Sequence, residues 1–106
     1  MRVLFDQGTP SPLRRFLDGH VVTTAFELGW QRLRNGELLA QAEAAGFELL
    51  ITTDQGLKYQ QNLSGRQIAV LVLNTTSWPR IQIGVTIVLS AINKARAGSF
   101  VEVAVP

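Results

Sequence analysis

The chain has 106 residues, is 46% hydrophobic and carries a formal net charge of +2, which predicts one folded domain with a single core. It contains no cysteine and one histidine, which excludes disulfide scaffolds, thiolate zinc sites, cysteine nucleophiles and histidine-based metal clusters. No apolar stretch reaches the length of a membrane span, and the charged first seventeen residues are unlike a secretory signal. We therefore expect a soluble cytoplasmic protein with no membrane part.

Short strands and helices alternate through the first half of the chain. Residues 3–5 predict a buried strand, and residues 10–17 predict a helix because proline is favoured in a first helical turn. Residues 21–24 predict a second strand. Residues 38–45 form helices readily by propensity, and Gly46 stands where a helix end favours a left-handed residue.

The third and fourth predicted strands cover residues 48–52 and 68–73, with a short helix over 57–63 between them. The fourth reads IAVLVL, and such an unbroken apolar run is typical of a strand that is covered on both faces of a parallel sheet.

The last third of the chain has two interpretations. The alternation of IQIGVTI is typical of a strand, whereas Ser77-Trp78-Pro79 is typical of a helix start, and Lys94 and Gly98 are typical of a helix end. We predict a helix over 78–97 and an edge strand over 99–105. The order of elements predicts a three-layer α/β/α domain over residues 1–106, with a mostly parallel central sheet of about five strands.

Polar side chains follow three of the predicted strands. Asp6 follows the first strand, Asp54 the third and Asn74 the fourth, while Glu37 lies in the first turn of a helix. Sites in open parallel sheets form beyond the carboxyl ends of the strands, so we expect these residues to converge there. An oxygen-only set of ligands suits Mg²⁺ or Mn²⁺, and such a metal can activate water for attack on a phosphodiester.

Each acid also has a purely structural interpretation. Asp54 can cap the following helix, Asp6 can stabilise the Gln7-Gly8 turn, and Glu37 is favourable in any first helical turn. A phosphoacceptor receiver domain is a further alternative, matched by Asp54 and Thr75. The receiver pattern also requires a second acid beside Asp6 and a lysine after the fifth strand, and this sequence has neither.

The chain resembles the compact PIN-like proteins of bacteria, a branch of the PIN-domain superfamily. The resemblance is carried by the segments VLFDQGTP, AFELGW, NGELL, LLITTDQ, YQQNL and TTSWPRI. It implies a PIN-like fold and a Mg²⁺- or Mn²⁺-dependent ribonuclease, often the toxin of a toxin–antitoxin pair. It also implies an RNA substrate, an antitoxin protein as a partner, and a homodimer.

The resemblance carries over residue by residue. Asp6, Glu37 and Asp54 match the family's catalytic, metal-binding acids. The family's fourth acid is replaced here by Asn74, which can still bind a metal through its carbonyl oxygen. The family often has a further acid two residues after the third one, and this position is Gly56 here. Residues expected beside the substrate are Gln7, Thr53, Gln55 and Lys58.

The missing acids keep a second hypothesis open. In it, the chain is a catalytically degenerate PIN-like module that binds RNA or a protein partner without cleaving anything.

Overall fold

The computed structural model describes residues 1–56 and 65–106. The helix predicted over 57–63, the YQQNL segment and Lys58 lie outside the described residues. The elements in chain order are β1 (Arg2–Phe5), the 3₁₀ helix η1 (Ser11–Phe16), β2 (Val21–Thr24), α1 (Asn35–Ala44), β3 (Leu49–Thr52), β4 (Ala69–Leu73), α3 (Trp78–Ile83), α4 (Val85–Lys94) and β5 (Phe100–Val103).

The five strands form one sheet in the order β2-β1-β3-β4-β5, and every neighbouring pair is parallel. The predicted α/β fold with a mostly parallel sheet is therefore confirmed. The chain passes from β1 outward to β2 and then returns to place β3 on the other side of β1. The strand order thus reverses between β1 and β3, and a crevice forms beyond the carboxyl ends of strands at such a reversal.

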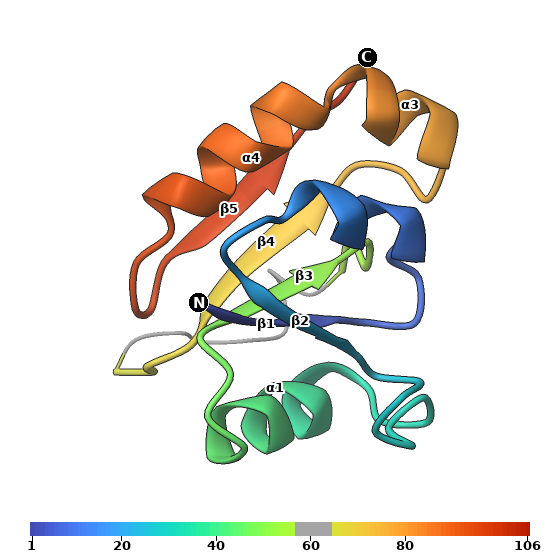
Figure 1. Cartoon of the computed structure of the whole chain (residues 1–106). Helices are drawn as coiled ribbons and strands as arrows, with labels where there is room; N and C mark the ends of the chain where they lie inside the picture. The colour runs from blue at the N-terminus through green and yellow to red at the C-terminus, as the bar shows by residue number, and fades with distance from the viewer. Residues whose placement is uncertain (57–64) are drawn as a thin grey trace.

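Alternate residues of the central strands face opposite sides of the sheet, as the two-residue period of a strand requires. Val3 and Phe5 of β1 belong to a core cluster that also contains residues of η1, α3 and α4. Leu4 between them belongs to a second cluster, packed with residues of α1. Figure 1 shows the same division, with α1 on one face of the sheet and α3 and α4 on the other. This double cover explains why β3 and β4 are buried along their whole length.

The ambiguous segment after β4 is helical, as predicted, but it forms two helices instead of one. Ser77 caps α3 through a hydrogen bond from the Arg80 amide, and α4 ends at Lys94. Gly84 separates the two helices at a point where a Cβ atom would lie 2.8 Å from Cγ1 of Val105. The C-terminal segment thus passes too close for a side chain at this position. Among the described residues, no helix is both long enough and apolar enough to cross a membrane.

Candidate functional site

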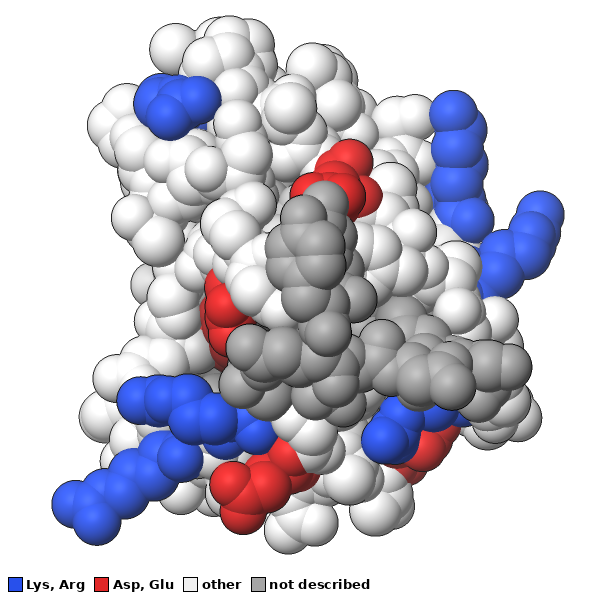
Figure 2. Space-filling view, turned by 180° about the vertical axis from the view of Figure 1, so that it is seen from behind, with Lys and Arg blue, Asp and Glu red and all other residues white. Residues whose placement is uncertain are grey.

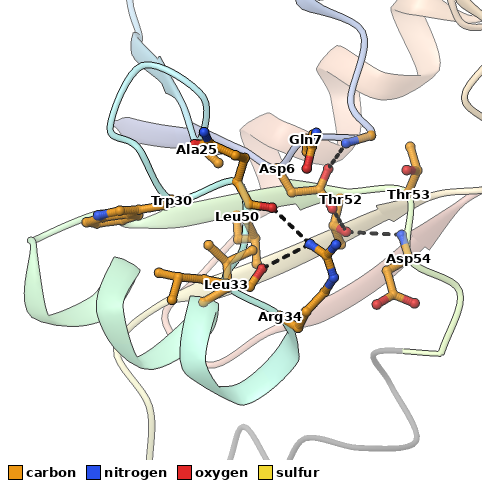
Figure 3. A pocket seen from close by; sticks show the side chains of 13 residues that line it. Asp6, Gln7, Ala25, Trp30, Leu33, Arg34, Leu50, Thr52, Thr53 and Asp54 are labelled. Atoms are coloured by element: carbon orange, nitrogen blue, oxygen red, sulfur yellow. Dashed lines mark hydrogen bonds between the residues drawn. The ribbon is translucent and has the colours of Figure 1, made fainter.

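A cavity of about 360 Å³ opens beyond the carboxyl ends of β1 and β3, where the strand order reverses. Asp6 directly follows β1 and Asp54 lies two residues after β3, and both line this cavity. Figure 3 shows the two acids on one side of it, with Thr52 between them. The complete lining is Asp6, Gln7, Gly8, Ala25, Trp30, Gln31, Leu33, Arg34, Leu38, Leu50, Thr52, Thr53 and Asp54.

Hydrogen bonds to both carboxylate oxygens hold Asp6 in place. Its Oδ1 accepts from the Gly8 amide at 3.1 Å and from the Thr9 hydroxyl at 2.8 Å. Its Oδ2 accepts a hydrogen bond from the hydroxyl of Thr52. The turn-stabilising role of Asp6 that the sequence suggested is thus present, and the same contacts fix the direction in which the carboxylate points.

Thr52 connects the two acids. Its side chain is 2% exposed, and its hydroxyl accepts a hydrogen bond from the Asp54 amide at 3.0 Å while it donates to Asp6. A hydroxyl carries one proton, so donation to Asp6 leaves its lone pairs for the Asp54 amide. The carboxylate of Asp54 is itself exposed, and its Oδ1 accepts from the Gly56 amide at 3.0 Å.

The side chain of Arg34 adds a positive charge to the lining of the same cavity. Its presence there is not predicted by the sequence. Its Nη1 donates to the carbonyl oxygens of Gln31 at 3.0 Å and Leu33 at 3.5 Å. Figure 3 shows the guanidinium extending from the start of α1 toward Thr52. Its Nε and Nη2 groups make no hydrogen bond to the described residues.

Glu37 and Asn74 do not join the two aspartates among the residues that line the cavity. Glu37 is exposed in the first turn of α1. The amide of Asn74 pairs with the backbone of Val105: Oδ1 accepts from its N–H at 3.0 Å, and Nδ2 donates to its carbonyl at 3.3 Å. Within residues 1–56 and 65–106, no group of three or more acids or histidines is placed to share a metal ion.

The residues predicted to contact substrate are divided in a similar way. Gln7 and Thr53 line the cavity. Gln55 does not, because its side-chain amide donates to the carbonyl of Leu73 at the end of β4. The site as described therefore consists of two carboxylates, neighbouring hydroxyl and amide groups, and one arginine.

The turn after β2 borders the site and is held by a capping box. The Thr24 hydroxyl accepts from the Glu27 amide at 3.1 Å, and the Glu27 carboxylate accepts from the Thr24 amide at 2.9 Å. The guanidinium of Arg14 binds both oxygens of the same carboxylate. A Thr-x-x-Glu motif is a known signal for this arrangement, so the sequence itself contains a sign of this turn.

Comparisons with family models, with curated proteins and with solved structures gave no match to this chain. The resemblance to PIN-like proteins thus stays an expectation from the sequence.

The hydrogen bonds from Arg14, then that from the Thr24 amide, lower the pKa of Glu27 from the ordinary 4.5 to about 2. Because folding lowers this pKa, the contacts stabilise the fold above the ordinary value, and the contribution is lost as the pH falls toward 2. In a carboxyl NMR titration, Glu27 should titrate near pH 2 in the wild type and at a higher pH in Arg14→Gln. Arg15→Gln, the matched control, should leave the midpoint unchanged. A wild-type midpoint above 4 would contradict this account of the turn.

Proposed function

We propose that this protein is a Mg²⁺- or Mn²⁺-dependent ribonuclease that hydrolyses phosphodiester bonds at the cavity containing Asp6 and Asp54. One observation carries the proposal. Two carboxylates from neighbouring parallel strands and the guanidinium of Arg34 line one cavity at the point where the strand order reverses. Sites in open α/β sheets occur at such reversals.

The donor groups fit a magnesium-type ion that is held by few protein ligands. Mg²⁺ usually keeps several waters and is bound through one or two carboxylates together with the phosphates of a substrate. Asp6 and Asp54 supply two carboxylates, and Thr53 adds a further oxygen to the cavity lining. When bound, such an ion lowers the pKa of a coordinated water and offsets negative charge on the phosphoryl group.

The chain's own residues would orient the carboxylates and bind the phosphate of the substrate. The three hydrogen bonds to Asp6 hold its carboxylate in one orientation before any ligand arrives, which reduces the cost of ordering it on binding. The Nε and Nη2 donors of Arg34 can pair with a phosphate, for which the planar guanidinium is well shaped. The hydrogen bonds of Thr52 hold the Asp6 carboxylate and the Asp54 backbone at fixed positions relative to each other.

A second candidate is a module of the same fold that binds RNA or a protein without catalysis. The observation that favours it is the position of Asn74. The amide of this residue pairs with the Val105 backbone, and Asn74 does not line the cavity. Glu37 is also outside the lining. In this alternative the guanidinium of Arg34 would bind a phosphate directly, without a metal ion.

Cleavage of a labelled single-stranded RNA separates the two candidates. The wild type should cleave with Mg²⁺ or Mn²⁺ and lose cleavage in EDTA, and Asp6→Asn or Asp54→Asn should lower the rate on the order of a hundredfold or more. Asp18→Asn, an exposed acid that precedes β2, is the matched control and should cleave normally. Glu37→Gln measures directly whether the glutamate outside the lining contributes.

Activity that survives both site substitutions, or that persists in excess EDTA, would exclude this mechanism. A well-folded wild type that binds RNA but never cleaves it would support the second candidate.

The same proposal extends to protein partners. Ile83 is 74% exposed and Ile87 is 47% exposed, and they lie four residues apart across the junction of α3 and α4. Large apolar side chains that gather on a surface often mark an interface. We propose that a second copy of the chain covers them, with an antitoxin-like protein as the alternative cover.

Light scattering at micromolar concentration tests the homodimer. The wild type should have the mass of a dimer, and Ile83→Glu should shift it to the monomer because a buried carboxylate without a partner is costly at an interface. Val21→Glu, at an exposed position of β2, serves as the control and should remain dimeric. A monomeric wild type would rule out the pairing, and a dimer that tolerates Ile83→Glu would place its interface elsewhere.

A further inference from the structure

Asp6 lies between two cavities. The second has a volume of about 510 Å³ and shares Asp6, Gln7 and Gly8 with the first. Its other lining residues are Thr9, Pro10, Ser11, Thr24, Phe26 and Thr76. Because the two cavities share these three consecutive residues, they adjoin each other at Asp6, and we call this pair of cavities the groove.

Phe26 is the most unusual side chain in this groove. It is 73% exposed and belongs to neither of the core clusters formed by the described residues. Exposing an aromatic ring to water forgoes the free energy that its burial would release. Packing within the described fold therefore does not explain an aromatic ring at this position, whereas contact with a ligand in the groove would explain it.

The turn that carries Phe26 is held firmly. Phe26 lies between Thr24 and Glu27, whose backbone and side-chain groups form the capping box, and Arg14 joins the box to β2 by donating to the Val22 carbonyl at 2.9 Å. The backbone beneath the ring is thus ordered before any ligand binds. A ring on an ordered turn costs less conformational entropy on binding than one on a loose loop.

The two cavities of the groove offer different side chains to a ligand. The first cavity contains the Arg34 guanidinium, whereas the second contains the Phe26 ring and the hydroxyl-bearing residues Ser11, Thr24 and Thr76. On the face shown in Figure 2, the described basic side chains are interspersed with acidic ones and gather in no single patch. Among the described residues, this face therefore offers no broad basic patch to a polyanion.

We propose that the two joined cavities bind single-stranded RNA, with one base stacked on Phe26 and a backbone phosphate on the other side of Asp6 paired with Arg34. This inference rests on the proposed ribonuclease function and names how its substrate is held. An exposed ring can stack on a base only where that base is not already stacked within a duplex. The groove therefore selects single strands, and stacking makes it tolerant of sequence.

The test is fluorescence anisotropy with a fluorescein-labelled single-stranded RNA in EDTA, so that binding is measured without cleavage. Phe26→Ala should weaken binding by about tenfold, the loss expected for one base–aromatic stack, and Phe26→Trp should retain it. Val21→Ala removes apolar surface at a position that is 64% exposed and outside both cavities, and it should bind like the wild type. Arg34→Gln should weaken binding and make it less dependent on salt, since one phosphate contact is lost.

The outcomes distinguish this inference from the proposed function. Equal binding by Phe26→Ala and the wild type, or tighter binding of a duplex with the same sequence, would overturn the groove even if the wild type cleaves RNA. If the affinity for single strands depends on Phe26 but the protein cleaves no RNA, RNA binding in the groove is supported and the proposed ribonuclease activity is ruled out.

Discussion

The candidate site depends on one hydroxyl group. Thr52 is buried at the end of β3, donates to the Asp6 carboxylate and accepts from the Asp54 amide. A buried hydroxyl that loses a partner is costly, so both contacts are maintained together and the end of β1 is tied to the turn after β3. The polar edge of the sheet is thereby ordered without a third acid. A cation or phosphate would meet carboxylates that are already positioned, and the free energy of ordering them is supplied by folding instead of by the ligand.

The strand order decides which side chains reach that edge together. Because β1 and β3 are neighbours on either side of the reversal, Asp6 and Asp54 share one cavity. Asn74 follows β4, one strand farther along, and its amide holds the C-terminal segment by pairing with Val105. An acid at this place would lose the donor that binds the Val105 carbonyl. Asn74 therefore has a structural role in this chain.

The sequence predicted the strands well because their apolar runs reflect burial on both faces, and it predicted where acids would follow them. It could not predict the break at Gly84, where Val105, distant in sequence, leaves no room for a Cβ atom. Nor could it predict the position of the Arg34 side chain, since its direction depends on the carbonyl groups of Gln31 and Leu33, which precede α1. Phe26 was missed for a related reason: an apolar residue after a strand suggests burial, and only the three-dimensional structure shows it exposed beside Asp6.

The central claim is that Asp6 and Asp54 together bind a divalent cation, and paramagnetic broadening of amide NMR signals by Mn²⁺ tests it most directly. Substoichiometric Mn²⁺ should first broaden the signals of residues around Asp6 and Asp54, and the effect should vanish in Asp54→Asn while the rest of the spectrum is preserved. Excess Mg²⁺ should restore the signals by competition. Broadening centred on other acids such as Asp18, or none at millimolar Mn²⁺, would contradict the claim.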